Sequence, residues 1–467
     1  MSSSPTDETP NQSFERLPLS PPTQANLKQL GYLEMTPIQS ACLPLSLAGK
    51  DLIAQAKTGS GKTAAFSLTL LFNLDSTRYA IQSLVLCPTR ELADQVAVEI
   101  RKLARTQENI KVMTLCGGTS LHRQIHSLSH GAHIIVGTPG RIIDHLDRGH
   151  LRLDHLNTLV LDEADRMLDM GFFDAIEKVI ELCPKNRQTL LFSATYPEGI
   201  ARLAKKFMNS PEQVKVESIH LESTLEQRCY EVRPSDKFDT VAKLLNHFKP
   251  VSTLAFCNTK QQCKLLTDFL HTKGFSVLTL HGDLEQRDRD QVLVLFSNRS
   301  CSVLVATDVA ARGLDINQIE AVINVDVSPD PEVHVHRIGR TGRAGETGLA
   351  LSLVSLPEMP SLVKIEQYQK QTLAWYPLDS LKSGEGVILK PPMITIQILG
   401  GRKEKIRPGD VLGALTAGTG YGRDEIGKIN VTEFVTYVAV KREIGREAVR
   451  KLNSGSLKGR PVKSRLL

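Results

Sequence analysis

The feature that most constrains this chain is a glycine-rich turn between a short apolar run and a helical run. The turn, Ala56-Lys57-Thr58-Gly59-Ser60-Gly61-Lys62-Thr63, follows apolar residues 52–54 and precedes residues 64–68, which have a helical pattern. Glycines let several backbone N–H groups converge on an anion, and the start of a helix adds its positive end. The turn therefore predicts a phosphate cradle, in which Lys62 reaches the β- and γ-phosphates and Thr63 holds Mg²⁺. The alternative is an ordinary Gly/Ser loop beside a lysine.

Four more apolar runs in the first half of the chain each end in a polar cluster. The runs are residues 84–87, 134–136, 158–161 and 190–192. Runs that are apolar throughout suit strands buried on both faces, which predicts a parallel sheet covered by helices. In such sheets ligands bind at the carboxyl ends of the strands. The polar clusters all fall at these ends, so we expect them to line one site.

The cluster Asp162-Glu163 completes the first chemical group. An acidic residue at the end of a buried strand, in the same sheet as a phosphate loop, suits Mg²⁺ coordination by Asp162. Glu163 is placed to orient or deprotonate an attacking water molecule. The alternative for an isolated Asp-Glu pair is a helix start that complements the helix dipole.

The strand pattern stops in a predicted linker over residues 209–224 and then restarts. Residues 253–256, 277–280, 303–306 and 321–323 are again buried-type strands, without a second phosphate loop. Two polar segments follow them, Thr307 to Asp315 and His336 to Arg343. Arginines spaced by glycines in the second segment suit guanidinium groups offered to a nucleotide bound elsewhere. The alternative is a basic surface loop.

Charge is distributed unevenly along the chain. Residues 393–467 carry fifteen Lys/Arg and seven Asp/Glu, a net charge of +8, whereas the whole chain has +6. A basic module on a nearly neutral body predicts an anionic polymer as its partner, and the alternative is a solvated basic tail. The eight cysteines form no CxxC pair, so we expect reduced, buried thiols in a cytoplasmic protein. Neither a signal peptide nor a membrane-spanning segment is expected.

The basic C-terminal stretch has the pattern of a small α+β module. Strands are predicted at residues 393–399, 426–429, 436–440 and 461–466, and helices at 410–417 and 446–452. The order βαββαβ is that of an RRM-like module. Ile396, Ile398 and Val438 are predicted to stand where such modules carry stacking aromatic rings, which disfavours base stacking. The expected RNA contacts are basic residues: Arg402, Lys403, Lys405, Arg423, Lys428, Lys441 and Arg442.

Taken together, the ordered motifs resemble the DEAD-box ATP-dependent RNA helicases. The motifs are Gln39, AKTGSGKT, PTREL, TPGR, DEAD, SAT, ARGLD and HRIGRTGR, and they cover about residues 14–355. The resemblance implies two RecA-like α/β domains, with ATP, Mg²⁺ and RNA bound across the cleft between them. Met35 and Lys57 stand where this family often has Pro and Gln.

The resemblance also implies roles for individual residues. Phe14, Thr36 and Gln39 match the adenine-recognising segment, and Gly313 and Asp315 lie near the nucleotide. Arg340 and Arg343 match the arginine fingers, while Ser193, Thr195 and His336 match residues that couple hydrolysis to domain closure. The remaining matched positions line the RNA backbone path: Pro88, Thr89, Arg90, Gly117, Gly118, Thr138, Arg141, Thr259, Gln286, Arg287, Thr307 and Arg312.

A helicase core followed by this basic module is similar to the bacterial DbpA-type DEAD-box proteins. That subfamily implies recognition of a hairpin in large-subunit (23S) ribosomal RNA and a role in assembling the 50S particle. We expect the protein to act as a monomer. Two alternatives remain open: a DEAD-box helicase for other RNAs, in messenger RNA turnover or cold adaptation, and an ATP-gated RNA clamp that does not separate strands. The predicted segments are a disordered N-terminus (1–13), a first RecA-like domain (14–208), a linker (209–224), a second RecA-like domain (225–383), a linker (384–392) and an RRM-like domain (393–467).

Overall fold

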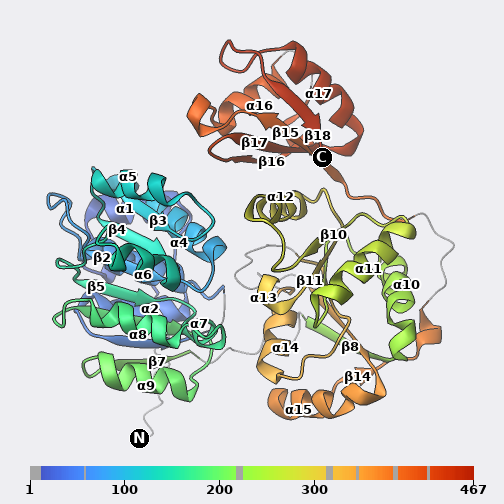
Figure 1. Ribbon diagram of the computed structural model, residues 1–467, viewed down its shortest axis with the longest axis horizontal. Helices are drawn as coiled ribbons and strands as arrows, with labels where there is room; N and C mark the ends of the chain where they lie inside the picture. The colour runs from blue at the N-terminus through green and yellow to red at the C-terminus, as the bar shows by residue number, and fades with distance from the viewer. Residues whose placement is uncertain are drawn as a thin grey trace, which may run out of the picture. The chain divides into compact units, whose positions relative to one another are not determined.

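Three β-sheets organise the chain in the computed structural model, which describes residues 12–56, 59–216, 225–311, 319–342, 347–381, 388–417 and 421–467. The chain divides into two compact units, residues 1–220 and 221–467. The first unit holds one sheet, and the second holds the other two (Figure 1). The described residues contain no helix that is long and apolar enough to cross a membrane.

The first unit is built on a seven-stranded parallel sheet with the order β3-β4-β2-β5-β6-β1-β7. Its strands are β1 (Leu52–Gln55), β2 (Ser83–Leu86), β3 (Val112–Leu115), β4 (Ile134–Gly137), β5 (Thr158–Leu161), β6 (Gln188–Ser193) and β7 (Glu212–Lys215). Its helices are α1 (Pro21–Gln29), α2 (Pro37–Leu47), α3 (Lys62–Phe72), α4 (Arg90–Leu103), α5 (Leu121–Ser129), α6 (Pro139–Asp147), α7 (Ala164–Asp169), α8 (Phe173–Glu181) and α9 (Glu198–Phe207).

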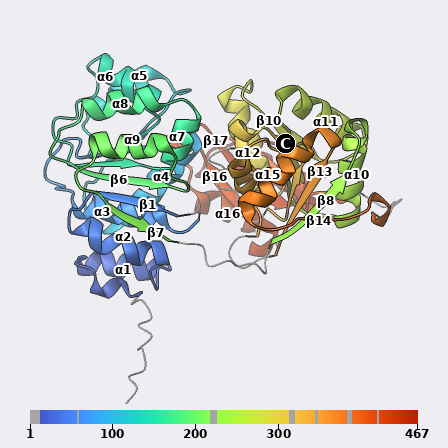
Figure 2. The same ribbon diagram turned by 90° about the horizontal axis from the view of Figure 1, so that it is seen from below.

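Both faces of this sheet are covered by helices, as the apolar runs predict. Side chains alternate between the faces, so Leu52 and Ala54 join the core under α2 and α3, while Ile53 joins the core under α8 and α9. Figure 2 shows these helix pairs on opposite sides of the strands. Parallel strands buried in this way bring all their carboxyl ends to one edge of the sheet.

The second unit begins with another seven-stranded parallel sheet, in the order β10-β11-β9-β12-β13-β8-β14. Its strands are β8 (Leu225–Glu231), β9 (Thr253–Phe256), β10 (Val277–Leu280), β11 (Val303–Ala306), β12 (Ala321–Asn324), β13 (Gly348–Val354) and β14 (Ala374–Trp375). Its helices are α10 (Lys237–Phe248), α11 (Lys260–Thr272), α12 (Gln286–Ser297), α13 (Asp308–Ala311), α14 (Pro331–Ile338) and α15 (Met359–Gln369).

The C-terminal module has the predicted order βαββαβ around an antiparallel four-stranded sheet, β16-β17-β15-β18. Its elements are β15 (Met393–Leu399), α16 (Pro408–Thr416), β16 (Ile426–Val431), β17 (Val435–Lys441), α17 (Gly445–Ser454) and β18 (Lys463–Leu466). The predicted fold class, two RecA-like domains and a small α+β module, is confirmed.

One part of the predicted linker 209–224 is wrong. Glu212–Lys215 forms the edge strand β7, which pairs with β1 in parallel register. The strand is polar and mostly exposed, so it has no apolar run that would mark it in the sequence. Residues 217–224 lie outside the described part of the chain.

The prediction that Ile396, Ile398 and Val438 face outward is also wrong. All three are fully buried against the helices of the module, together with Val411 of α16. Strand residues alternate between faces, so the outward positions are those one step away, including Thr395 and Gln397 on β15 and Tyr437 on β17.

Part of this outward face is covered by the second RecA-like domain. Thr395 Oγ1 accepts a hydrogen bond from Asn298 Nδ2 (3.1 Å) and lies 2.7 Å from Ser300 Oγ. Asn298 Oδ1 in turn accepts from Asn430 Nδ2 of β16 (3.1 Å). Thr395 is therefore completely buried, although it sits on the face that RRM modules commonly use for bases.

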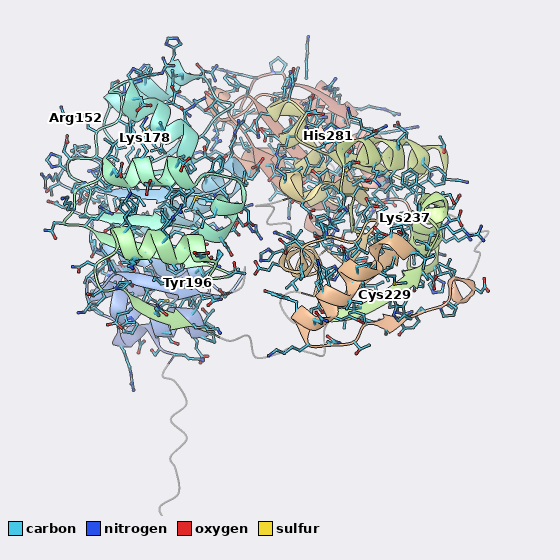
Figure 3. All side chains as sticks on the ribbon, turned by 60° about the horizontal axis from the view of Figure 1, so that its bottom comes forward. Arg152, Lys178, Tyr196, Cys229, Lys237 and His281 are labelled. Carbon is cyan, nitrogen blue, oxygen red and sulfur yellow. The ribbon has the colours of Figure 1, made fainter. Side chains whose placement is uncertain are left out.

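An ion network links the start of α10 to the segments that follow β12 and β13. Lys237 at the start of α10, labelled in Figure 3, donates to Asp326 Oδ1 (2.9 Å) and Glu358 Oε1 (2.8 Å). We expect Lys237→Met to destabilise the second unit by about 3 kcal/mol, because the buried Asp326 and the half-buried Glu358 lose their shared cation. Thermal unfolding followed by circular dichroism measures this loss. Lys243→Met, an exposed lysine on the same helix, is the control, and equal melting temperatures for the two variants would contradict the expectation.

Candidate ATP and RNA site

The phosphate loop lies between β1 and α3, as predicted. Gly61 has φ = 96°, a left-handed conformation, and a Cβ atom built there would lie 2.6 Å from Gln39 Nε2, so this position requires glycine. Lys62 is the first residue of α3, and its buried Nζ donates to the carbonyl oxygen of Ala56 (2.7 Å). Lys57 and Thr58 lie outside the described residues. The N-terminus of α3 and the ammonium group of Lys62 together place positive charge at this corner, which suits an anion.

Gln39 connects the adenine-recognising segment to this loop. Its Oε1 accepts the backbone N–H of Thr36 (2.9 Å), and its Nε2 donates to the carbonyl oxygen of Gly61 (3.1 Å). Phe14 is buried and packs edge-on against Tyr32, with ring centroids 6.4 Å apart. The segment thus holds the backbone of the phosphate loop, while its predicted contact with adenine stays a prediction.

The acidic pair follows β5 directly. Asp162 is buried, and its Oδ1 accepts the backbone N–H of Glu163 (3.0 Å). Burial and the Glu163 carboxylate raise the pKa of Asp162 to about 7, while Lys62 acts in the opposite direction. Glu163 adopts a left-handed backbone conformation, with φ = 50°, and its Oε2 accepts from Arg166 Nη1 (2.9 Å). Backbone strain of this kind is common at functional sites.

The donor set around Asp162 fits Mg²⁺. Burial and the neighbouring Glu163 carboxylate disfavour ionisation of Asp162 although Lys62 and Arg166 are near, so a divalent cation would favour the ionised form of Asp162. A single carboxylate from the protein, a threonine hydroxyl such as that of Thr63, and phosphate oxygens form a typical Mg²⁺ coordination set. The described residues contain no cluster of three or more acidic, histidine or cysteine side chains that could hold a metal by themselves.

The segment Ser193-Ala194-Thr195 is tied to the acidic motif by Asp165. Asp165 Oδ2 accepts from the backbone N–H groups of Ala194 (3.0 Å) and Thr195 (2.9 Å), and from Thr195 Oγ1 (3.1 Å). Ser193 Oγ accepts the backbone N–H of Asp165 (3.3 Å). Tyr196, labelled in Figure 3, comes next in the chain and is exposed. The segment predicted to couple hydrolysis to movement is therefore bonded to the helix that begins beside Glu163.

The predicted RNA-path residues of the first unit gather at the carboxyl ends of β2, β3 and β4. Thr89 caps α4 by accepting the backbone N–H of Leu92 (3.3 Å). Gly117 and Gly118 pass so close to the Arg90 guanidinium that a Cβ atom at Gly118 would lie 1.8 Å from Arg90 Nη1. Pro88 precedes α4, Thr138 precedes α6, and Arg141 lies in the first turn of α6.

The second unit places its predicted residues in the same way. Thr259 follows β9 and caps α11, Thr307 follows β11, and Gln286 and Arg287 open α12. His336 is in the last turn of α14, and Arg340 lies two residues beyond that helix, largely buried. Arg312, Gly313, Asp315 and Arg343 lie outside the described residues.

Arg337, which was not predicted as a site residue, is central to this group. Its buried guanidinium forms a bidentate pair with Asp308 (2.6 and 2.7 Å) and donates to the Asp326 carbonyl oxygen (2.6 Å) and to Asn258 Oδ1 (2.8 Å). It therefore links the segments that carry Thr259, Thr307 and Arg340. The sequence signal was only its place between His336 and Arg340 in an arginine-rich segment.

Several of the predicted basic contacts of the C-terminal module have partners within the protein. Lys441 pairs with Asp424 (3.0 Å), and Lys428 donates to Ser297 Oγ (3.0 Å). The Arg442 guanidinium donates to the carbonyl oxygens of Pro391 (2.7 Å) and Met393 (3.0 Å). Arg402, Lys403 and Lys405 are exposed in the loop after β15, where the Lys403 ammonium lies 4.7 Å from the Phe434 ring centroid. The side chain of Arg423 lies outside the described part.

Comparison with known proteins identifies this arrangement. Residues 36–203 match the DEAD/DEAH box helicase family, residues 236–345 the helicase conserved C-terminal domain, and residues 395–466 the DbpA RNA binding domain. The ATP-dependent RNA helicase DbpA of Escherichia coli is 52% identical over 97% of this chain and 99% of its own length. The RNA helicase CshA of Geobacillus kaustophilus is 46% identical over 70% of each chain.

Solved structures agree with this result. Dbp5 of S. cerevisiae, bound to RNA and ADP BeF3, matches with a TM-score of 0.73 and 32% identity over 79% of this chain and 96% of that one. Mss116p, bound to ssRNA and AMP-PNP, matches with a TM-score of 0.69 and 26% identity over 77% of each chain. The chain belongs to the DEAD-box ATP-dependent RNA helicases, and is an RNA-stimulated ATPase of the DbpA type with a C-terminal RNA-binding domain.

Proposed function

We propose that this helicase acts on large-subunit ribosomal RNA during assembly of the 50S particle, directed by its C-terminal module. The observation that carries the proposal is the module itself, which matches a DbpA RNA binding domain and carries a net charge of +8. A target of this kind places the enzyme in the cytoplasm, acting as a monomer on a pre-50S particle. Exposed basic residues in the loop after β15 suit a structured RNA held by phosphate contacts.

For the chemical step we propose that ATP binds at the phosphate loop, with its adenine beside Phe14 and Gln39. Lys62 leaves the Ala56 carbonyl oxygen and pairs with the phosphates, and Asp162 and Thr63 hold Mg²⁺. Mg²⁺ held by these residues would neutralise part of the negative charge of the phosphates. Glu163 accepts a proton from the attacking water, and Arg340 and Arg343 stabilise the charge that develops on the γ-phosphate.

RNA binding then favours the state in which hydrolysis occurs. The two units each supply part of the RNA path, so RNA held by both would stabilise the closed arrangement that also brings the arginines to ATP. This is a thermodynamic coupling, in which each ligand favours the conformation that the other binds. Contacts directed at the backbone give the core little sequence preference, so target choice is assigned to the module.

The test is steady-state ATP hydrolysis with no RNA, with an unrelated structured RNA, and with a fragment of 23S ribosomal RNA of equal mass. Strong stimulation by the ribosomal fragment alone supports the proposal. Equal stimulation by both RNAs would leave an RNA helicase with another target. A strand-separation assay on a short duplex, with and without ATP, distinguishes the helicase from an ATP-gated clamp.

A double variant, Arg402→Ala with Lys405→Ala, tests the loop after β15. We expect the concentration of ribosomal RNA needed for half-maximal stimulation to rise about tenfold, because each lost phosphate contact weakens binding, while kcat at saturating RNA is kept. The control is Arg446→Ala, an exposed arginine beside Gly445, which packs against Ile394 at the opposite end of β15. An equal shift in the control would show that net charge, rather than this loop, governs binding.

A further inference from the structure

The side chain of Gln124 joins two segments that are separate in the sequence and that both carry predicted RNA contacts. One is the loop after β3, which holds Gly117 and Gly118, and the other is the first turn of α6, which holds Arg141. Gln124 lies on α5 between them and is 7% exposed. Gln124 is not among the residues assigned above to ATP or RNA binding.

All four hydrogen bonds of the Gln124 amide are directed across this junction. Nε2 donates to the Cys116 carbonyl oxygen (3.0 Å) and to Thr119 Oγ1 (2.6 Å), both in the loop after β3. Oε1 accepts from Arg141 Nη1 (2.7 Å) and His145 Nε2 (2.9 Å), both on α6. The orientation is unambiguous, because a carbonyl oxygen can only accept and a guanidinium can only donate.

These contacts fix Arg141 through its Nη1 atom and leave its Nη2 atom without a hydrogen bond among the described residues. Nη1 also donates to the Thr119 carbonyl oxygen (3.1 Å), and Nε lies 3.8 Å from Asp144 Oδ2. Within the part of the chain that the structure describes, Nη2 makes no hydrogen bond. An arginine held through Nη1 with Nη2 open can meet a phosphate oxygen without first losing side-chain freedom.

His145 on α6 also holds the side chain of Gln124 in place. It is completely buried, and because Gln124 Oε1 can only accept, His145 Nε2 carries a proton and donates it to this bond. Burial, the Arg141 guanidinium and His150 lower the pKa of His145, which keeps a second positive charge away from Arg141. The Gln124 carbonyl oxygen is thereby shared between one cation and one neutral donor.

We infer that Gln124 is a positioning residue for RNA binding by the first domain. It sets the distance between the loop after β3 and Arg141, so that successive backbone phosphates of one RNA strand meet both segments at once. The inference rests on the proposed RNA-path roles of Gly117, Gly118 and Arg141. Gln124 itself does not touch the RNA.

The test uses the full chain with AMP-PNP and a single-stranded RNA, whose Kd is measured by fluorescence anisotropy over a series of KCl concentrations. Gln124→Met keeps the size of the side chain and removes its hydrogen bonds. We expect Kd to rise about tenfold, because Arg141 is no longer held in its binding position. The slope of log Kd against log[KCl] should fall by ~0.7, the value for one phosphate contact to a single strand.

A double-mutant cycle separates positioning from a general structural effect. If Gln124 acts through Arg141, the double variant Gln124→Met/Arg141→Ala binds RNA no more weakly than Arg141→Ala alone. Independent effects that multiply in the double variant would overturn the inference. If Gln124→Met does not fold, Gln124→Glu replaces it, since a carboxylate would neutralise the Arg141 guanidinium and cause the same non-additive loss.

The matched control is Gln82→Met. Gln82 is also buried and bonded through both ends of its amide, to Asp75 N and to the carbonyl oxygens of Asp75 and Arg78, but it lies at the amino end of β2. An equal change in Kd for this control would overturn the inference. If Arg141→Ala leaves Kd unchanged, Arg141 does not contact the RNA. Both the proposed RNA path and the inference about Gln124 are then wrong. If Arg141→Ala weakens binding and Gln124→Met does not, only the positioning role fails.

Discussion

Replacing Arg340 by alanine is expected to abolish RNA-stimulated ATP hydrolysis while ATP still binds. The residues that we propose to hold the nucleotide before catalysis, Lys62, Thr63 and Gln39, all lie in the first unit. Arg340 lies in the second unit, so its guanidinium is proposed to reach the phosphates only in the closed state. An arginine that stabilises the transition state of phosphoryl transfer contributes about 10³–10⁵ in kcat, so a loss in this range is expected.

The backbone around Arg340 is held by contacts that do not involve the Arg340 side chain. The backbone N–H of Arg340 donates to the Arg337 carbonyl oxygen (3.1 Å), and Arg337 is anchored to Asp308 and Asn258 through its own side chain. Removing the Arg340 side chain therefore leaves the anchor of this segment in place. We expect the Kd for a fluorescent ATP analogue to change by less than about threefold, because ground-state binding is kept.

The measurement is steady-state hydrolysis at saturating RNA, together with a binding titration of the fluorescent analogue. Lys364→Ala, an exposed lysine on α15 of the same domain, is the control and should keep full turnover. Arg340→Lys keeps the charge without the planar fork of donors, so it should recover only a small part of the rate. Turnover of Arg340→Ala close to that of the parent would disprove the arginine-finger assignment.

The sequence predicted the parts of the fold where burial leaves a continuous apolar signal. Residues 84–87 and 303–306 were identified as strands because side chains on both of their faces are covered by helices. Strand β7, with the sequence Glu-Gln-Val-Lys, lies at a sheet edge and is mostly exposed, so its sequence predicts a linker instead of a strand. Edge strands carry little hydrophobic pattern, and β7 is recognised only by its pairing with β1.

The C-terminal sheet shows a different limit. Its fold was predicted correctly, but Ile396 was placed on the wrong face. The two faces of β15 are hard to separate by composition, because Thr395 is buried against Asn298 and Ser300 while Ile396 is buried against helices. When both faces of a strand are covered, alternation no longer distinguishes inside from outside.

In the candidate site, residues within contiguous motifs could be predicted, whereas residues that act through tertiary contacts could not. Lys62 lies in the motif of the glycine-rich turn between β1 and α3, and Asp162 directly follows the apolar run of β5. Gln124 and Arg337 have no such mark, since their importance lies in partners such as Cys116 and Asp308, which are near them only after folding. A single glutamine or arginine in a helix is ordinarily a surface residue.

Replacing Glu163 by glutamine is the second change with a large expected effect, and it separates hydrolysis from RNA binding. Glutamine has the shape of glutamate and can still accept the hydrogen bond from Arg166 Nη1, so the left-handed turn at this position is kept. It cannot take up a proton from the attacking water. Loss of a general base lowers the rate about 10²–10⁴-fold, so kcat should fall about 100-fold or more.

The side chain introduced by Glu163→Gln is also neutral, which removes one of the charges that oppose ionisation of Asp162. ATP and Mg²⁺ should therefore bind at least as well as in the parent, and RNA should remain bound for longer, because release is proposed to follow hydrolysis. Single-turnover hydrolysis and RNA dissociation after a chase measure the two effects separately. The control is Glu177→Gln, a surface carboxylate on α8 that pairs with Lys206, which should leave both unchanged.

If Glu163→Gln hydrolysed ATP at the parent rate, the water-activating role would belong to another residue. If it lost RNA binding together with hydrolysis, Glu163 would act on the structure of the site and not on the chemical step.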